Sequence, residues 1–370
     1  MISSPMLMAF CEVPSESKTK INRAGTTLVQ ENVSQQALES ALDLANRWRA
    51  SHAYPINTFQ ATLRTKLKRF KGNPIVAQRL KRMPTIIDKL RRYPNMKLTT
   101  MQDIGGVRAI LNTVKDVQKL AEDYRSNRRL LHDLIDQKDY IENPRSEDGY
   151  RGIHLIYRYK NKKVHYYDGL RLELQIRTKL QHKWATAVES MGTFLGQALK
   201  SRQGDQEWLD FFAITASAFA HLEQCQPVPR FDNLNFEETC MEVARHEKQL
   251  GALDKMSGLS IAAKAITTPK KKAWHYHLIV LNSLERRVHV TSYDRESFEE
   301  AMGDYSKFEA EAVRGKKIEP VLVSAGPLKQ LRQAYPNFFL DIRNFASIVG
   351  DLTRIPTAPP KRNENRKILG

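Results

Sequence analysis

The chain has 370 residues, enough for two domains with sizeable hydrophobic cores. Its 59 Lys and Arg residues against 41 Asp and Glu give a net charge of +18. Such an excess points to a polyanionic partner, nucleic acid first and an anionic membrane second, or to a protein that is simply basic. The three cysteines form no CxxC pair and no Cys/His ligand spacing, which argues against a zinc site and a disulfide framework. No apolar run is long enough for a membrane span and no secretory signal is recognisable, so we expect a cytoplasmic protein.

The first hundred residues carry most of the charge imbalance. Residues 1–32 are mixed and polar, and we expect them to be loosely ordered, before two amphipathic helices over 36–53 and 59–70. Residues 61–100 contain twelve Lys and Arg and a single acid. A strand over 75–82 would present Arg79 and Lys81, and Pro84 suits the first turn of a helix that carries Lys89. These cations could bind several phosphate oxygens, or they could form a solvated basic face.

Two strands carry the next candidate residues. Residues 103–111 predict a core strand with Asp103 at its start, which could bind magnesium or cap a turn. Residues 170–176 alternate between apolar and polar side chains, as in a strand with one buried face. The polar face of this strand carries four residues: Arg171, Glu173, Gln175 and Arg177.

In the segment before that strand, Tyr150 lies between Gly149 and Gly152, and His154 follows two residues after Gly152. Strands over 155–160 and 164–167, joined by a turn at 161–163, predict a hairpin, and Asp168-Gly169 predicts a second turn. This meander would bring the loop 150–154 close to Glu173. The hypothesis is a site built from both segments, although a surface strand could show the same alternation.

The remaining chain predicts helices over 180–191 and 209–222, then a boundary near Pro227 and Pro229. We therefore expect a catalytic domain over 33–228 and a small C-terminal α+β domain over 229–354, with strands near 274–281, 286–293 and 320–324. Residues 355–370 form a basic, Pro-rich tail that we expect to be flexible. The expected fold class is α+β, with a mixed β-sheet flanked by helices.

Four motifs in order resemble those of the RelA/SpoT synthetase domain. Residues 79–89 (RLKRMPTIIDK) resemble RxKxxxSIxxK, and residues 103–110 (DIGGVRAI) resemble DLxxxR. Residues 139–154 (DYIENPRSEDGYRGIH) resemble DYIxxPKxNGYxSxH, and residues 173–178 (ELQIRT) resemble ExQIRT. The resemblance implies a nucleotidyltransferase-like fold, and no hydrolase region with an HD pair accompanies it.

The resemblance also implies an enzyme that transfers the β,γ-pyrophosphate of ATP to a 3′-hydroxyl. Positioning and electrostatic stabilisation dominate reactions of this kind. Four residues would bind ATP, the first three at the phosphates and the last at the adenine: Arg79, Lys81, Lys89 and Arg108.

By the same resemblance, Asp103 and Glu173 would hold Mg²⁺, and Glu173 would take the proton of the attacking hydroxyl. Tyr150 would stack on the base of the acceptor. Three further residues would contact or orient acceptor and phosphate groups: His154, Gln175 and Arg177.

Two departures from the motif concern the acceptor. Gly152 stands where the family has Ser, and Asp148 stands where it has Asn. The family includes toxic members that modify the 3′-terminal adenosine of tRNA, and the +18 charge favours such a large RNA acceptor. The alternatives are alarmone synthesis from GDP or GTP, and an RNA-binding sensor with a degenerate synthetase fold.

The C-terminal domain resembles the regulatory part of CapRel-type single-chain toxin–antitoxin proteins, which serve in phage defence. The resemblance rests on residues 331–345 (LRQAYPNFFLDIRNF) and the general layout. It implies that Tyr335, Phe338 and Phe339 plug the synthetase or meet a phage protein as trigger, although they could equally form a small core. We accordingly expect removal of the residues beyond about 230 to raise toxicity.

Overall fold

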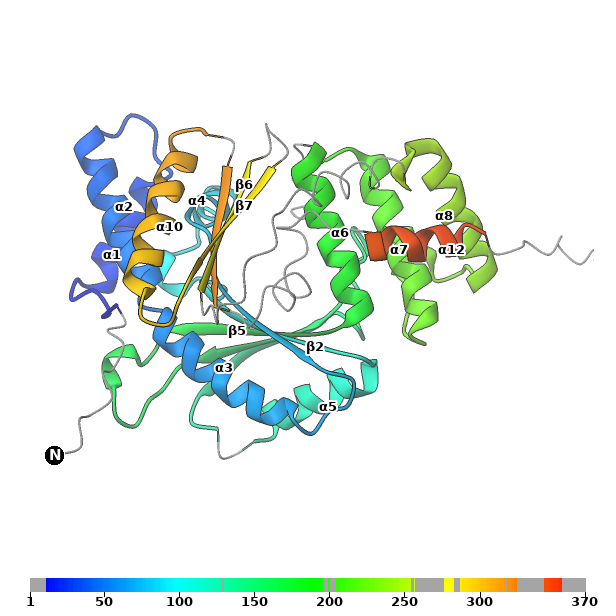
Figure 1. The fold of residues 1–370 in the computed structure, drawn as a ribbon, viewed down its shortest axis with the longest axis horizontal. Coiled ribbons are helices and arrows are strands. Elements are labelled where there is room, and N and C mark those ends of the chain that lie inside the picture. Colours follow the sequence, from blue (N-terminus) through cyan, green and yellow to red (C-terminus); the bar gives the residue numbers. More distant parts are fainter. Residues whose placement is uncertain are drawn as a thin grey trace, which may run out of the picture.

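A computed structural model describes residues 11–127, 130–195, 199, 204–253, 256, 276–282, 287–316, 318–324 and 343–354. Its centre is a five-stranded sheet in the order β1-β2-β5-β4-β3 (Figure 1). The strands are β1 (Ile75–Leu80), β2 (Gly105–Leu111), β3 (Asp133–Asp139), β4 (Ile153–Arg158) and β5 (Arg171–Thr178). The strands β2 and β5 are parallel and the other neighbours antiparallel, so the expected mixed sheet is confirmed.

The sheet has one apolar face, which α3 (Ala53–Leu67) and α5 (Val114–Arg125) cover from below in Figure 1. The predicted alternation in β5 supplies it, because Leu172, Leu174 and Ile176 are all at most 1% exposed. Burial of these side chains against the two helices fixes the register of the strand, since a shift by one residue would bury the polar set instead.

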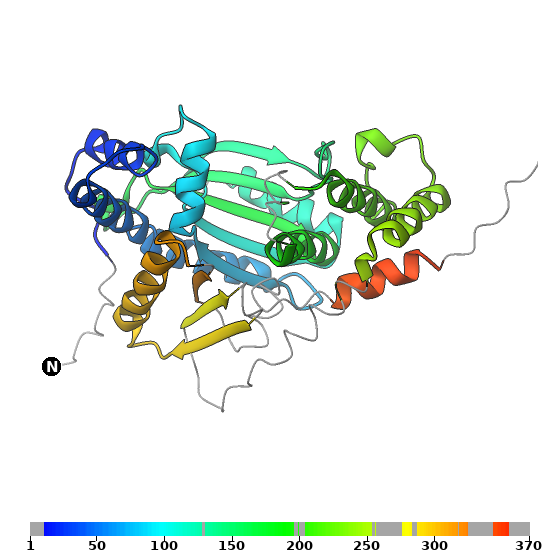
Figure 2. The same ribbon diagram turned by 90° about the horizontal axis from the view of Figure 1, so that it is seen from above.

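The opposite face of the sheet is polar and carries α4 (Met83–Arg92) and α6 (Lys179–Leu195). The view from above shows α4 lying across the sheet near one end (Figure 2), whereas α6 rises from the sheet near the other end (Figure 1). The polar residues of the strands therefore lie in the space between α4 and α6, which is where a site can form.

The N-terminal part corrects one expectation. Residues 18–27 form α1 (Lys18–Thr27), which packs on α2 (Gln35–Ala50), whereas we expected residues 1–32 to be loosely ordered. Ile21 and Ala24 of α1 are buried in the main core. Ser17 accepts a hydrogen bond from the backbone N–H of Lys20 and caps this short helix.

A second hydrophobic core joins four helices: α6, α7 (Gln206–Leu222), α8 (Phe236–Leu250) and α12 (Arg343–Leu352). Phe345 of α12 lies 6.0 Å from the ring centre of Phe212 and 5.6 Å from that of Phe219. This core contains residues from both sides of the expected boundary at 228. The division into domains at that point stays a prediction.

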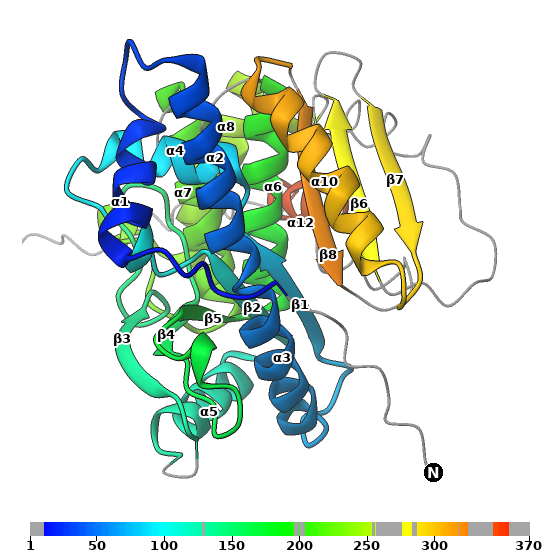
Figure 3. The same cartoon turned by 90° about the vertical axis from the view of Figure 1, so that its left-hand side faces the viewer.

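The C-terminal unit is a three-stranded antiparallel sheet in the order β7-β6-β8 with α10 (Phe298–Val313) packed on it. Its strands are β6 (Tyr276–Asn282), β7 (Arg287–Tyr293) and β8 (Ile318–Ser324). In Figure 3, α10 lies between this sheet and α2. The tail 355–370 and three residues named above, Tyr335, Phe338 and Phe339, lie outside the described residues.

Two local predictions were wrong. The chain forms no second hairpin strand at 164–167 but a 3₁₀ turn (His165–Tyr167), and the sequence interpretation missed β3. The turn forms because the side chain of Asn161 accepts two backbone hydrogen bonds, while Tyr167 is buried and stacks on Tyr54 at 4.5 Å. None of the described helices has the length and apolar composition needed to cross a membrane.

Candidate functional site

The strand register gathers the candidate residues on the polar face of the sheet. Paired residues on neighbouring strands share a face. Arg79 pairs with Gly106, which in turn pairs with Glu173. Gln175 pairs with Arg108 on one side and with His154 on the other. The alternation that buries the leucines of β5 thus also assembles the predicted site.

A continuous hydrogen-bonded chain crosses this face. Arg108 Nε donates to Gln175 Oε1 at 3.4 Å, and Gln175 Nε2 donates to Glu173 Oε2 at 2.7 Å. The other carboxylate oxygen, Oε1, lies 2.9 Å from His154 Nδ1. His154 Nε2 is in turn 2.7 Å from the hydroxyl of Tyr150. Five residues from β2, β4, β5 and the loop before β4 are therefore connected through Glu173.

The protonation of this chain follows from its charges. Burial lowers the pKa of His154, but Tyr150 and Glu173 outweigh it and raise that pKa to about 9. Burial raises the pKa of Glu173, but the charge and hydrogen bond of His154 outweigh it, so the pKa falls below its ordinary value. At neutral pH, His154 is thus an imidazolium that donates from both nitrogens, and Glu173 is a carboxylate.

Asp103 lies between two lysines at the edge of the same face. Its Oδ2 accepts a hydrogen bond from Lys81 Nζ at 2.8 Å, and its Oδ1 accepts one from Lys89 Nζ at 3.0 Å. Burial would raise the pKa of Asp103, but the two ammonium groups outweigh it and hold the pKa far below its usual range. Burial lowers the pKa of Lys81. The predicted strand and helix thus do bring both lysines to Asp103.

A magnesium ion fits these residues. Asp103 and Glu173 are close enough for the charge of the first to oppose the lowering of the pKa of the second. No group of three or more His, Cys, Asp or Glu side chains in the described part of the chain could hold a metal. Mg²⁺ prefers one or two carboxylates together with water and substrate phosphates, and two carboxylates meet that need. Asp103 would be available to the ion once Lys81 and Lys89 bound phosphate oxygens instead.

The arginines Arg79 and Arg82 face α6. Their guanidinium nitrogens lie 3.9 and 3.7 Å from the Oε1 atom of Glu189, so the carboxylate sits between two cations. The sequence placed Glu189 on a helix but assigned it no role. The contact arises because α6 approaches β1, and no pattern in the sequence around Glu189 indicates this approach.

Arg177 is the most buried of the predicted acceptor contacts, with 4% of its surface exposed. It donates a hydrogen bond to Nδ1 of His182, which lies on α6. The positive charge of Arg177 helps to lower the pKa of Tyr150, against the effect of burial, so these two residues are close.

Tyr150 sits in a cage of other side chains. The guanidinium carbon of Arg145 lies 4.7 Å from the centre of its ring, and Tyr140 and Trp184 meet it edge-on. Asp148 accepts a hydrogen bond from the backbone N–H of Tyr150 and is 2.6 Å from Arg145. The acid that departs from the family motif therefore fixes the local turn. The sequence interpretation missed Arg145, and stacking of Tyr150 on a base stays a prediction.

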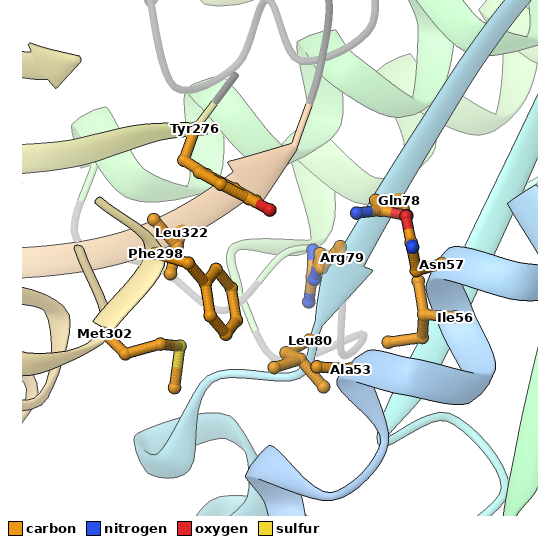
Figure 4. A pocket seen from close by; sticks show the side chains of 10 residues that line it. All are labelled: Ala53, Ile56, Asn57, Gln78, Arg79, Leu80, Tyr276, Phe298, Met302 and Leu322. Atoms are coloured by element: carbon orange, nitrogen blue, oxygen red, sulfur yellow. The ribbon is translucent and has the colours of Figure 1, made fainter. Parts of the chain in front are cut away.

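The C-terminal unit adds a wall beside β1. A small pocket, partly open to solvent, lies between β1 and α3 on one side and the C-terminal unit on the other (Figure 4). Arg79 lines one side, while Tyr276, Phe298 and Met302 line the other. The second unit thus reaches the strand that carries one of the predicted ATP ligands.

The region of the chain that contains these residues is similar to known proteins. Residues 78–193 match the model described as the region found in RelA / SpoT proteins. Over 118 residues, 31% of this chain and 54% of the relative, the chain is 35% identical to GTP pyrophosphokinase YjbM of Bacillus subtilis. Over 131 residues, 34% of this chain and 42% of the relative, it is 31% identical to the uncharacterized protein Rv1366 of Mycobacterium tuberculosis.

Among solved structures, the small alarmone synthetase 1 from Bacillus subtilis aligns with 49% of this chain and 93% of its own length, at 26% identity and a TM-score of 0.41. The chain spans about half the length of the curated relatives it matches. The matched region 78–193 contains every predicted synthetase-site residue, from Arg79 to Arg177. It supports the synthetase family at the level of this region.

Proposed function

We propose that the chain is an ATP-dependent pyrophosphokinase that transfers the β,γ-pyrophosphate of ATP to the 3′-hydroxyl of a tRNA end. The observation that carries the proposal is the polar face of the sheet. There Glu173 lies in a buried hydrogen-bonded chain next to Asp103, which two lysines hold. The match of residues 78–193 to the RelA/SpoT region supports the same chemistry.

The residues suggest a division of tasks. Lys81, Lys89 and Arg79 would bind the phosphates of ATP, where their positive charge offsets the charge of the transferred group. Arg108 would lie at the adenine, as its planar guanidinium suits stacking. Glu173 would accept the proton of the attacking 3′-hydroxyl. The oxygen of that hydroxyl would then form a bond to the β-phosphorus of ATP while AMP leaves.

His154 would keep Glu173 in place during this step. Its imidazolium donates to the carboxylate of Glu173, and the side-chain amide of Gln175 donates to the same carboxylate. These two neighbours, His154 and Gln175, fix the orientation of the base. Mg²⁺, when bound by Asp103 and Glu173, would supply positive charge to the phosphate oxygens.

Two acceptors remain to be separated. The departures from the motif at Asp148 and Gly152 leave the acceptor open, and the net charge of +18 favours tRNA, since a long RNA offers many phosphates to a basic surface. The printed names of the relatives favour a guanine nucleotide, because two of the curated relatives are called GTP pyrophosphokinases. The second candidate function is therefore (p)ppGpp synthesis from GDP or GTP.

A transfer assay distinguishes the candidates. The chain is incubated with ATP labelled in the γ-phosphate and either deacylated tRNA, GDP or GTP. Label in tRNA supports the first proposal, and label only in guanine nucleotides replaces it by the second. Glu173→Gln should abolish transfer to either acceptor, and a variant that keeps full activity would contradict the role of Glu173 and favour a sensor without catalysis.

Transfer to tRNA would block aminoacylation, so we propose that the protein inhibits translation and is restrained by its own C-terminal part, with phage defence as the setting. Replacing Tyr335, Phe338 and Phe339 together by Ala should then slow the growth of cells that express the chain. Growth equal to that with the wild type, at equal protein levels, would remove the restraint from the proposal.

A further inference from the structure

Helix α10 brings a carboxylate from far along the sequence to the start of α4. Glu309 is 2% exposed, and its Oε1 accepts hydrogen bonds from the hydroxyl of Tyr305, at 2.6 Å, and from the backbone N–H of Met83. Met83 is the first residue of α4. The C-terminal unit thus touches the element that follows the first synthetase motif.

Arg49 of α2 completes this cluster. Its Nη1 donates to the hydroxyl of Tyr305 at 2.5 Å, and its Nη2 lies 3.0 Å from Glu309 Oε2 as an ion pair without the geometry of a hydrogen bond. The guanidinium carbon is 4.5 Å from the centre of the Tyr305 ring. Because Arg49 is 1% exposed, separating the pair would leave an unpaired buried charge, which is strongly unfavourable.

The first turn of α4 needs an acceptor from outside the helix. Its N-cap residue, Arg82, makes no capping hydrogen bond, and Pro84 has no N–H to offer. Met83 is fully buried, so its N–H would otherwise lack a partner. A carboxylate at this end also suits the positive end of the helix dipole.

The start of α4 lies between the two lysines that hold Asp103. Lys81 precedes Met83 by two residues, and Lys89 lies in the last turn of the same helix. A change in the direction of the first turn would therefore move both ammonium groups relative to Asp103.

We propose that Glu309 is a positioning residue for the phosphate-binding lysines. It fixes the first turn of α4 and, through it, the places of Lys81 and Lys89. The inference rests on the proposed function, because it takes those lysines as ligands of the ATP phosphates. It makes α10 a component of the synthetase site, so removal of the whole C-terminal part should lower ATP binding even where restraint is relieved.

Two triple variants of the full chain separate positioning from mere stability. Both contain Arg49→Met and Tyr305→Phe, and they differ in Glu309→Gln or Glu309→Leu. The Leu variant has apolar side chains throughout the cluster but leaves the buried N–H of Met83 without an acceptor. The Gln variant leaves an unpaired amide N–H but keeps an acceptor for Met83.

Positioning predicts that ATP affinity follows the acceptor and not the melting temperature. Calorimetric titration with ATP and Mg²⁺, at a temperature at which both variants are folded, should give a Kd about tenfold higher for the Leu variant than for the Gln variant, a difference of about 1.4 kcal/mol in binding free energy. Glu300→Gln, an exposed change on the same helix, should leave the Kd unchanged. Equal Kd values, or weaker ATP binding by the Gln variant than by the Leu variant, would overturn the proposal.

Hydrogen exchange in the wild-type protein gives a second test that needs no variant. The amide of Met83 should exchange more slowly than that of Gln206, the first residue of α7, whose N-cap makes no side-chain hydrogen bond. A fast Met83 amide would refute the contact. If the amide is slow and ATP binds but no acceptor is modified, the proposed function fails while the positioning contact stands.

Discussion

At the scale of single residues, the charge of His154 determines how the site responds to pH. The pKa of its imidazole is raised from 6.5 to about 9 in the folded protein, so the folded state binds the proton more tightly than the unfolded chain. The stability that this proton supplies is fully present below pH 6.5 and is lost as the pH rises toward 9.

We therefore expect the melting temperature of the wild type to fall between pH 6.5 and 9 by more than that of His154→Gln. The difference of about 2.5 pKa units corresponds to at most about 3 kcal/mol in the free energy of unfolding. Thermal unfolding followed at several pH values measures it. The exposed His165→Gln variant is the control, and parallel curves for wild type and His154→Gln would contradict the assigned protonation.

Gly149 sets the turn that leads into Tyr150. Its φ is +73°, and a Cβ there would lie 2.6 Å from Ala216 Cβ on α7, which adds a clash to backbone strain. Gly169 also has a positive φ, +88°, but nothing lies within 4 Å of a Cβ built on it. Substitution of Gly169 therefore measures the effect of backbone strain alone, and substitution of Gly149 measures strain together with a packing clash.

Gly149→Ala should lower the free energy of unfolding by about 2–4 kcal/mol, the sum of strain and overpacking. Gly169→Ala should cost only the strain of about 1–2 kcal/mol. Chemical denaturation of both variants provides the comparison. Equal losses would mean that α7 yields to the new methyl group, and that the turn before Tyr150 is less tightly packed than the distances indicate.

At the scale of secondary-structure elements, α12 ties the end of the described chain to the helix that borders the site. Phe345 is 1% exposed and packs on Phe212 and Phe219 of α7, within the core that α6 shares. α6 in turn brings Glu189 to Arg79 and Arg82. The packing of α12 therefore supports the border of the site from outside it.

Phe345→Ala should destabilise the protein by about 3–5 kcal/mol, as expected for removal of a fully buried aromatic ring. Ser347→Ala, on the exposed side of the same helix, should change the stability little. Urea denaturation measures both changes. A loss below about 1 kcal/mol for Phe345→Ala would show that α12 is not an integral part of this core.

Elements with a strong period were predictable from the sequence, and elements without one were not. The alternation of β5 and the helical spacing of α2 and α5 reflect burial on one side, so they appear in the sequence as well as in the structure. The missed strand β3 (DLIDQKD) pairs at the sheet edge and has no fully buried residue, so it shows no such period. The hairpin prediction failed because Asn161 and Tyr167 favour a turn over a strand.

At the scale of the whole molecule, the sequence predicted a set of candidate residues that the fold brings together, but not the residues that surround them. The motifs contain Asp103, Tyr150 and Glu173, and their adjacency follows from the strand order. The partners Glu309 and Glu189 come from helices distant in sequence, where a buried acid has no local pattern that differs from an exposed one. Contacts of this kind arise from the packing of whole units.

The net charge bears on the choice of acceptor, since a polyanion and a small nucleotide respond differently to salt. Each phosphate neutralised by Lys or Arg releases counterions, so the affinity for RNA falls steeply as the salt concentration rises. If the basic surface contacts about four phosphates of the tRNA end, the logarithmic slope should be near −3, or roughly 60-fold between 50 and 200 mM salt. A GDP pocket makes fewer phosphate contacts and should show a shallower slope.

Fluorescence anisotropy of 5′-labelled deacylated tRNA and calorimetry with GDP, both over this salt range, give the two slopes. We expect measurable tRNA binding with the steep slope and weak GDP binding. A tRNA slope shallower than about −1, together with tight binding of GDP, would assign the +18 charge to solubility and make the guanine nucleotide the acceptor. The test depends on the charge of the surface alone, so it remains informative for variants such as Glu173→Gln that transfer nothing.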